Sequence, residues 1–425
     1  MEYEITLNTL TYGGDAMGRL PDGRAVFVPF GLPGERVRIR LVEEKKNFAR
    51  GELVEILEAS PQRIAPRCKH FGECGGCHYQ NLSYEDQLKA KTEILRDQLT
   101  RIGKIENPPV QTMVPSPSPW NYRNHVQFHL TEEGKLGYVP QILGEKGLGV
   151  MAITECHLPE GSINTLWPQL EFEPETDIER VSVRAGVDED LVLVLESESP
   201  EPPELEIEAG ISIAHVFEEH TVVIAGNESI TVRVLERDFR VSAASFFQVN
   251  TAMAAKLVEH LLANLPITST DTLLDVYCGA GLFSAFFAQK CERVIGIESS
   301  PSSCEDFAFN LDEFENVELY EGLAEEILPA FVGQTESPLG IANPPYVLVD
   351  PPRAGLDKTV VDGILKLRPK AIAYVSCDPS TLARDAVRLS NGGYTLKQVT
   401  PFDLFPQTYH IESISIFERY RLSQK

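Results

Sequence analysis

The sequence lacks several features that would narrow its class at once. No run of 18 apolar residues occurs in its 425 positions, so no membrane span is expected. We find no internal repeat of fixed period, no low-complexity tract and no metal-ligand spacing among the nine histidines. Basic charge is also scarce, because 38 Lys and Arg stand against 63 Asp and Glu, a net charge of −25. The length and the hydrophobic content of 43% instead predict a globular chain of two or three domains.

An N-terminal secretion signal is absent as well, so we expect a cytoplasmic protein whose eight cysteines are not in disulfides. Cys68, Cys74 and Cys77 lie within ten residues, and Gly75 and Gly76 separate the last two. Thiolates this close can surround a small metal centre, and glycines let backbone N–H groups approach the sulfurs. The spacing alone is compatible with an iron–sulfur cluster or with zinc.

A strand, a glycine turn and a helix are predicted in the second half of the chain. Residues 272–277 form an apolar strand, residues 278–281 read Cys-Gly-Ala-Gly, and residues 282–290 continue as a helix. A second strand, residues 293–297, ends at Glu298, at the interval where an acid binds ribose hydroxyls. A dinucleotide site would want a third glycine where Ser284 stands. The pattern therefore favours S-adenosylmethionine in a class I methyltransferase.

A third strand, residues 346–349, leads into Asp350-Pro351-Pro352-Arg353. Ligands of open α/β sheets bind at the carboxyl ends of strands, so Asp350 is expected to face the cofactor or a base. The tetrapeptide at 343–346, Asn-Pro-Pro-Tyr, matches the motif of amino-methyltransferases and keeps that activity open. It precedes the strand, however, and its position favours the Asp350 motif.

Cys377 follows a further apolar strand, and Glu412 supplies a carboxylate later in the chain. A thiolate can add to carbon 6 of uracil and make carbon 5 nucleophilic toward a methyl group. A general base must then remove the proton on carbon 5. A lone cysteine after an apolar strand is more often a small buried hydrophobe, so its neighbours have to decide.

With Ser-Phe-Phe-Gln-Val-Asn at 245–250 and Phe-Pro-Gln-Thr-Tyr-His-Ile-Glu at 405–412, the sequence resembles the RNA uracil-5-methyltransferase family. The resemblance is to its RumA-type branch, which has a TRAM domain and an iron–sulfur cluster and acts on 23S rRNA. Leu282 departs from the asparagine of many relatives. The same chemistry on tRNA stays open. The resemblance implies that Cys377 is the nucleophile and Glu412 the base. It implies S-adenosylmethionine contacts from Gln248, Tyr277, Glu298 and Asp350, and it implies Cys156 as the fourth cluster ligand. With Cys156 it implies a [4Fe–4S] cluster bound by Cys68, Cys74, Cys77 and Cys156.

Three domains are expected. Residues 1–58 alternate apolar and polar positions in short runs, at 3–11, 25–29, 35–41 and 48–57, and with the family's glycine patterns they predict a TRAM domain, an OB-like β-barrel. Residues 59–235 are expected to form a β-rich iron–sulfur and RNA-binding domain. Residues 83–101 are predicted to be a helix, capped by Ser83, that packs on the third domain. That domain, residues 236–425, is the α/β Rossmann-like methyltransferase domain.

The acidic charge is concentrated between residues 111 and 235, which carry 6 basic and 22 acidic side chains. We expect this region to turn a solvated face away from RNA. Phosphate contacts are expected from Arg40, Lys45, Lys46 and Arg50, and base stacking or pairing from Phe246 and Arg123. A monomer with RNA as its partner is expected.

Overall fold

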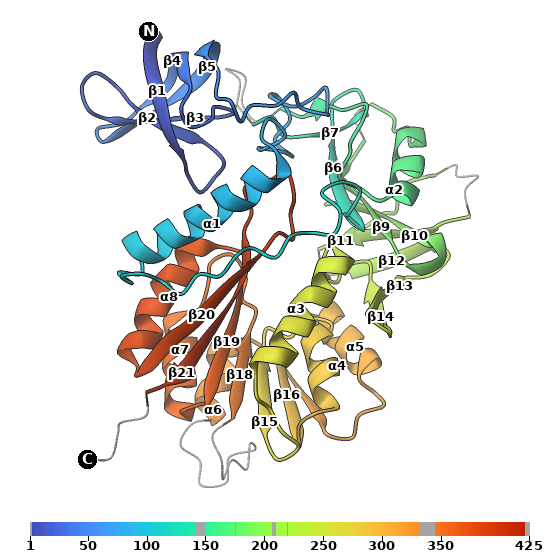
Figure 1. Ribbon diagram of the computed structural model, residues 1–425. Helices are drawn as coiled ribbons and strands as arrows, with labels where there is room; N and C mark the ends of the chain where they lie inside the picture. Colours follow the sequence, from blue (N-terminus) through green and yellow to red (C-terminus); the bar gives the residue numbers. More distant parts are fainter. Residues whose placement is uncertain are drawn as a thin grey trace, which may run out of the picture.

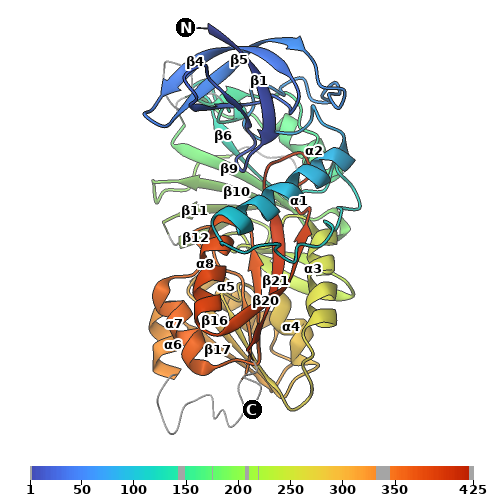
Figure 2. The ribbon, with the colours of Figure 1, turned by 60° about the vertical axis from the view of Figure 1, so that its left-hand side comes forward.

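The computed structural model (Figure 1) describes residues 2–141, 149–174, 176–205, 210–218, 220–331 and 345–420. Three β-structures follow one another along the chain: a barrel, a central sheet and a C-terminal sheet covered by helices. Figure 2 shows them stacked from top to bottom. None of the described helices is long and apolar enough to cross a membrane.

The barrel is closed by five strands in the order β1-β2-β3-β5-β4. Apolar side chains such as Leu7, Val37 and Ile39 alternate into its interior and are fully buried. Four of the strands were predicted. Strand β2, a run of four residues after the Gly13-Gly14 turn, was missed because four residues are too few to show a period of two. The strands are β1 (Glu2–Leu10), β2 (Ala16–Arg19), β3 (Ala25–Val28), β4 (Arg36–Glu44) and β5 (Phe48–Glu58).

A single long helix, α1 (Tyr84–Arg101), follows the cysteine-rich segment. Ser83 caps it as predicted, because its Oγ accepts a hydrogen bond from the N–H of Asp86. Although α1 comes early in the sequence, it packs against α8 (Pro379–Asn391) on the C-terminal sheet. Its Lys91 donates from Nζ to Asp403 Oδ1 at 2.6 Å, and both side chains are fully buried.

The central sheet has seven strands in the order β12-β11-β10-β9-β6-β7-β8, all antiparallel except the β10–β11 pair. Its core includes Phe128, Val181 and Leu195, with helix α2 against one face. The elements are β6 (His125–Leu130), β7 (Leu136–Tyr138), β8 (Met151–Ala152), α2 (Gly161–Leu166), β9 (Ile178–Ala185), β10 (Leu191–Ser197), β11 (Ser212–Phe217) and β12 (His220–Ala225), with 3₁₀ turns at Trp167–Gln169 and Val187–Glu189.

A two-stranded hairpin, β13 (Ser229–Val234) and β14 (Arg237–Ser242), connects the central sheet to the C-terminal one. Its apolar residues Val232 and Phe239 share a core with Leu257 and Phe283 of the following helices. The expected boundary between residues 235 and 236 therefore falls in the turn of this hairpin and would separate two paired strands. The pairing that joins the two strands is tertiary information, which the sequence around this boundary does not carry.

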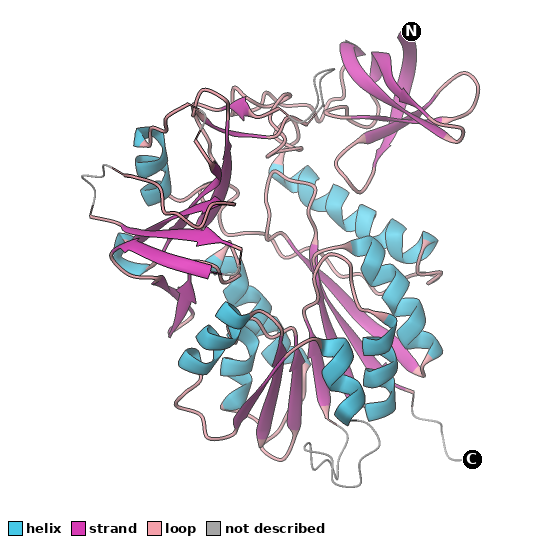
Figure 3. Ribbon diagram, turned by 180° about the vertical axis from the view of Figure 1, so that it is seen from behind, coloured by secondary structure: helices cyan, strands magenta, loops and turns pink. Residues whose placement is uncertain are grey.

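The C-terminal sheet has the order β17-β16-β15-β18-β19-β21-β20, and β21 is the strand that runs antiparallel to its two neighbours, β19 and β20. Helices cover both of its faces (Figure 3). The strand, helix and second strand predicted around the glycine turn are all present. The elements are α3 (Thr251–Asn264), β15 (Thr272–Val276), α4 (Leu282–Ala288), β16 (Arg293–Glu298), α5 (Pro301–Asn310), β17 (Val317–Glu321), α6 (Ala324–Phe331), β18 (Tyr346–Val349), α7 (Lys358–Leu367), β19 (Ala371–Ser376), α8, β20 (Tyr394–Phe402) and β21 (Glu412–Arg419).

Candidate active site and cysteine cavity

The predicted nucleophile and base meet at one edge of the C-terminal sheet. Strand β19 ends at Ser376 and antiparallel β21 begins at Glu412, and Ser376 is the register partner of Ser413. Cys377 and Glu412 therefore leave adjacent strands at the same edge. The parallel strands β15, β16 and β18 end there too, which brings Tyr277, Glu298 and Asp350 to this edge.

The glycine turn after β15 has the left-handed backbone that its residues predict. Gly281 has φ +88°, and a Cβ at this position would lie 2.3 Å from a methyl carbon of Leu311. Tyr277, with a φ of +66°, adopts this conformation despite its side chain. Glu298 accepts a hydrogen bond from the N–H of Gly279 at 2.9 Å and so ties the end of β16 to the turn. A side chain at Gly279 would meet no atom within 4 Å, so a ligand can approach the backbone here.

Two buried carboxyl groups lie next to this turn. Burial, opposed by a hydrogen bond from Ser284, raises the pKa of Asp275 to about 7. Burial and the charges of Asp275 and Glu298 raise the pKa of Asp350 to about 8. Ser284 Oγ donates to Asp275 Oδ2 at 2.6 Å, which gives a structural role to the serine that replaces a third glycine. Sequence analysis did not assign a site role to Asp275 or Ser284, although both lie inside the recognised motif.

The surroundings of Cys377 disfavour the thiolate form of its side chain. Burial, then the nearby carboxylates of Glu412 and Asp350, raise its pKa to about 12, while Arg353 opposes the shift. Burial and the charge of Asp350 also raise the pKa of Glu412 well above its usual value. Within the described part of the chain, Glu412 Oε1 is buried and has no hydrogen-bond partner. A buried carboxyl oxygen without a partner is costly, so this position calls for an explanation other than stability.

The barrel reaches this edge through one side chain. Tyr12, just after β1, donates from its hydroxyl to Asp378 Oδ2 at 3.0 Å. The other oxygen of Asp378 caps α8 by accepting from the N–H groups of Ser380 and Thr381. The Tyr12 ring also meets Tyr409 edge to face, with centroids 5.7 Å apart. The residue after Cys377 is thus fixed by a contact from another β-structure, which no local sequence pattern indicates.

Gln248 and the two phenylalanines before it lie at the entry to α3. Phe246 is 68% exposed, whereas Phe247 is buried against Phe239 with ring centroids 5.6 Å apart. Phe246 is therefore the one free to stack on a base. Gln248 is buried, and its carbonyl oxygen accepts a hydrogen bond from Asn124 Nδ2 at 3.2 Å.

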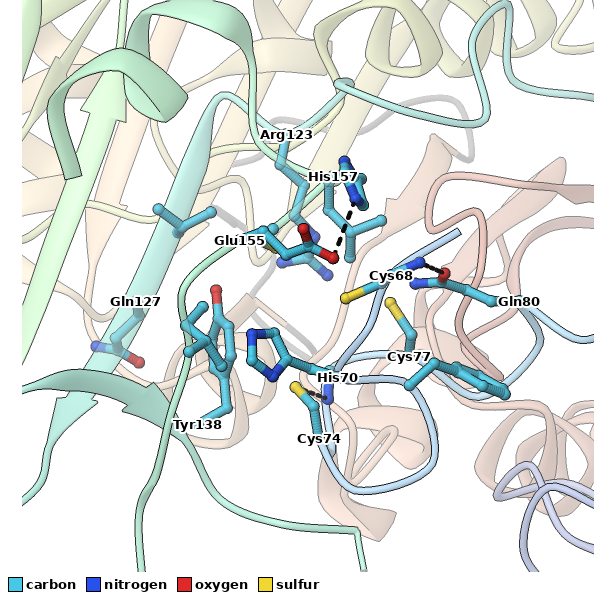
Figure 4. A pocket seen from close by; sticks show the side chains of 16 residues that line it. Cys68, His70, Cys74, Cys77, Gln80, Arg123, Gln127, Tyr138, Glu155 and His157 are labelled. Atoms are coloured by element: carbon cyan, nitrogen blue, oxygen red, sulfur yellow. Dashed lines mark hydrogen bonds and ion pairs between the residues drawn. The ribbon is translucent and has the colours of Figure 1, made fainter. Parts of the chain in front are cut away.

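The four predicted cluster cysteines line one cavity of about 270 Å³, shown in Figure 4. All four are free thiols, and burial raises the pKa of each, that of Cys74 to about 11. The N–H of Gly76 donates to Cys74 Sγ at 3.4 Å, as the glycines in this loop led us to expect. A Cβ at Gly75 would lie 2.5 Å from the carbonyl oxygen of Val139. Among the described residues, no three His, Cys, Asp or Glu side chains converge as the ligands of a single metal ion would.

Arg123 does not lie on an open surface, where sequence analysis placed it as an RNA contact. Its side chain lines the cysteine cavity, and its guanidinium carbon lies 5.7 Å from the ring centre of Phe405. The adjacent Tyr122 is buried and donates from its hydroxyl to the carbonyl of Pro406 at 3.0 Å. An aromatic next to a cation suggested base stacking, but here both side chains pack inward between the cavity and the loop that precedes Glu412.

The remaining predicted motif, Asn343-Pro344-Pro345-Tyr346, starts outside the described residues, which resume at Pro345. Tyr346 is the first residue of β18, and its hydroxyl donates to the carbonyl of Pro266 at 3.2 Å.

Comparison with known proteins fits this arrangement. Residues 217–420 match the model of the tRNA (Uracil-5-)-methyltransferase family, and residues 1–54 match the TRAM domain. An uncharacterized RNA methyltransferase of Halalkalibacterium halodurans is 33% identical over 98% of this chain and 96% of its own length. Another, from Aquifex aeolicus, is 34% identical over 98% of both chains. The chain belongs to the RNA uracil-5-methyltransferase family.

The fold of this RNA uracil-5-methyltransferase is also that of a solved structure. The tRNA (uracil-54, C5)-methyltransferase of Pyrococcus abyssi, in complex with S-adenosyl-L-homocysteine, superposes with a TM-score of 0.74. The match is 24% identical and covers 97% of this chain and 99% of the other. The expected methyltransferase fold with an N-terminal TRAM barrel is thereby confirmed. The expected family is confirmed by the family model and the two RNA methyltransferases.

Proposed function

We propose that this enzyme transfers a methyl group from S-adenosylmethionine to carbon 5 of a uridine in structured RNA, through a covalent bond from Cys377. The observation that carries the proposal is the β19–β21 register, which sets Cys377 beside Glu412 at the edge where the glycine turn lies. Gln248, Tyr277, Glu298 and Asp350 are the residues proposed to hold S-adenosylmethionine. When bound there, the cofactor supplies the electrophilic methyl group.

The side chains of the chain itself account for the remaining steps. Once the Cys377 thiol has lost its proton to solvent, its sulfur forms a bond to carbon 6 and the electron pair of the 5,6 double bond moves to carbon 5. Carbon 5 then bonds to the methyl group, whose bond to the donor sulfur breaks and leaves its electron pair on that sulfur. Glu412 takes the proton from carbon 5, the double bond re-forms and the carbon–sulfur bond breaks. The thiolate is regenerated. The target base has to leave its stack to reach Cys377, and the exposure of Phe246 supports a role for this ring in stacking on RNA.

Two substitutions separate these steps. Cys377→Ala should abolish methylation and leave S-adenosylmethionine binding intact, because the thiol acts on the base. Glu412→Gln should form the covalent adduct and release it slowly, so a protein–RNA species stable to denaturation should accumulate on a gel. Cys291→Ala, which removes a buried thiol at the opposite edge of the sheet, is the matched control and should keep normal turnover. Normal product release by Glu412→Gln would exclude Glu412 as the base.

For the substrate we propose 23S rRNA, as the family branch suggests, with tRNA as the second candidate. The tRNA candidate is favoured by the name of the family model and by the substrate of the Pyrococcus abyssi enzyme. Mapping 5-methyluridine in both RNAs from cells that lack this gene tests the choice: the missing modification identifies the substrate.

For the cysteine cavity we propose a [4Fe–4S] cluster ligated by Cys68, Cys74, Cys77 and Cys156. Four thiols line a shared cavity, a donor set that suits either a [4Fe–4S] cluster or zinc, and the branch that the sequence resembles carries the cluster. Protein purified without oxygen should be brown, with an absorbance band at about 400 nm and about four irons per chain. Cys74→Ser should lose the iron, whereas Cys304→Ser, a buried thiol outside the cavity, should retain it. Colourless protein with one zinc per chain would contradict the cluster.

A further inference from the structure

The loop between β20 and β21, residues 403–411, ends at the proposed base. Phe402 and Glu412 are register partners, so the two strands close the loop at its base. Glu412 itself begins β21, and one of its carboxyl oxygens has no hydrogen-bond partner among the described residues. Its position therefore depends on the backbone that leads into it. The contacts that hold this loop come from sequence-distant parts of the molecule.

Gln407 is the point where that loop is most constrained. Its φ is +68°, a left-handed conformation that costs a non-glycine residue of order 1 kcal/mol or more and persists only where the surroundings impose it. Its side chain is 2% exposed. Two successive N–H groups, those of His78 and Tyr79, donate to its carbonyl oxygen at 2.8 and 3.1 Å. Both belong to the segment that directly follows Cys77.

A second set of bonds comes from α1. Gln87, which is 1% exposed, donates from Nε2 to Gln407 Oε1 at 3.0 Å and accepts from the N–H of Gln407 at 3.1 Å. The same Nε2 lies 3.0 Å from the carbonyl oxygen of Tyr79. The amide of Gln87 thus connects α1, the cysteine segment and the loop. Two buried glutamines that bond reciprocally specify a single geometry, because either one alone would leave polar atoms unsatisfied.

We propose that Gln87 and Gln407 are positioning residues for the Glu412 base, and that the cysteine segment and α1 set the geometry of the proton-removal step through them. This inference rests on the proposed function, because it assigns a task to Glu412. A displacement of about 1 Å in a reacting group can lower a rate by about 100-fold. Loss of the hydrogen bonds between Gln87 and Gln407 should therefore slow release of the methylated product, while cofactor binding and formation of the adduct continue.

The test measures the covalent protein–RNA species after incubation with RNA and S-adenosylmethionine. Gln87→Leu removes the amide at nearly constant volume and should accumulate the adduct as Glu412→Gln does, with release slowed by about 10- to 100-fold and unchanged S-adenosylmethionine affinity. Gln98→Leu alters a buried glutamine on the same helix whose side chain bonds to Asp97 and not to the loop among the described hydrogen bonds, and it should release product normally.

Two further variants keep the test decisive if Gln87→Leu fails to fold. Tyr122→Phe removes the hydroxyl that donates to the carbonyl of Pro406 and also interacts with Arg123, and it should slow release by a smaller factor. Gln407→Gly tolerates the left-handed backbone whereas Gln407→Ala does not, so the alanine variant should be the slower of the two. The inference would be overturned, and the proposed base kept, if folded Gln87→Leu or Tyr122→Phe protein accumulated no adduct while the Glu412→Gln variant did. Absence of the adduct in Glu412→Gln as well would overturn the proposed base.

Discussion

At the scale of single residues, the site is a group of acids around one thiol. Asp275, Asp350 and Glu412 are all buried enough to raise their carboxyl pKa values, and each charge that forms among them disfavours the next. The Cys377 thiol shares this environment, and only Arg353 opposes the rise in its pKa. Arg353 belongs to the Asp-Pro-Pro-Arg motif, but sequence analysis gave a role only to the acid at its start.

The raised pKa of Cys377 predicts a steep pH dependence of its reactivity. Because the thiolate is the reactive form and the pKa is about 12, alkylation of Cys377 by iodoacetamide should rise about tenfold per pH unit from pH 7 to 10. Peptide mass spectrometry would follow Cys377 separately from the other cysteines. A plateau below pH 9 would contradict the raised pKa.

Arg353→Gln should slow this alkylation at every pH in that range. Removing the cation takes away the interaction that favours the thiolate, so the pKa of Cys377 rises further. Arg419→Gln, at the far end of β21, is the matched control and should leave the alkylation rate unchanged. Faster alkylation in Arg353→Gln would show that the cation does not stabilise the thiolate.

At the scale of elements, the C-terminal sheet is completed by a helix from the first quarter of the chain. Helix α1 packs on α8, and its buried Lys91 pairs with Asp403 at the start of the β20–β21 loop. Burial lowers the pKa of Lys91, while Asp403 opposes the shift. Removing only one partner of such a pair strongly destabilises the fold, because the other charge stays buried and uncompensated.

Lys91→Met should therefore lower the free energy of unfolding by about 3–5 kcal/mol, measured by urea denaturation. Adding Asp403→Asn should recover part of the loss, since the second substitution removes the uncompensated charge. Lys89→Met, which alters an exposed ion pair on the same helix, should change stability by no more than about 0.5 kcal/mol. Equal losses in the two lysine variants would contradict this role of the buried pair.

The contact between barrel and sheet predicts a catalytic effect of a barrel residue. Tyr12→Phe removes the hydrogen bond to Asp378, which flanks Cys377, and should lower the rate of adduct formation by about tenfold without changing S-adenosylmethionine affinity. Tyr320→Phe removes a hydroxyl near Glu318 at the opposite edge strand and should have no effect. Deletion of residues 1–58 should accordingly reduce chemistry as well as RNA affinity. An unchanged rate in Tyr12→Phe would limit the barrel to RNA binding.

The elements that sequence analysis found and those it missed differ in how local their causes are. The strand, glycine turn and helix at 272–290 and the cap of α1 are set by neighbouring residues, and they were predicted within a few positions. Strand β2 is too short for a period, and the hairpin at 229–242 is defined by its partner strand. The inward packing of Arg123 against Phe405, nearly 300 positions later, depends on tertiary contacts that no local pattern carries.

At the scale of the whole molecule, an acidic protein has to bind an acidic polymer. Three of the four predicted phosphate contacts on the barrel, Arg40, Lys45 and Arg50, lie in ion pairs with neighbouring acids. Except for Arg50–Asp15, whose acid is buried, these pairs are exposed, so each contributes little to stability and can give way to a phosphate. The net charge of −25 still limits the number of such contacts.

RNA affinity should consequently depend only weakly on salt. Roughly three to five phosphates are expected to be neutralised, each adding about 0.7 to 0.9 to the slope of log affinity against log salt. Titrations between low and physiological salt would measure it. Glu201→Gln with Glu204→Gln, on the exposed acidic surface of the central region, should leave the affinity nearly unchanged. A steep slope, or a large gain from these two changes, would show that this acidic surface borders the RNA path.

The pairing of Lys91 with Asp403 also has a consequence for the order in which the protein is made. The two residues are 312 positions apart, so a ribosome releases α1 long before the strands that cover it. Until β20 and β21 emerge, the apolar face of α1 and its lysine have no sheet to pack on, and contacts of such long sequence separation form slowly. The nascent N-terminal half therefore stays incompletely folded until the last residues of the chain emerge. The site with its base can assemble only after synthesis is nearly complete.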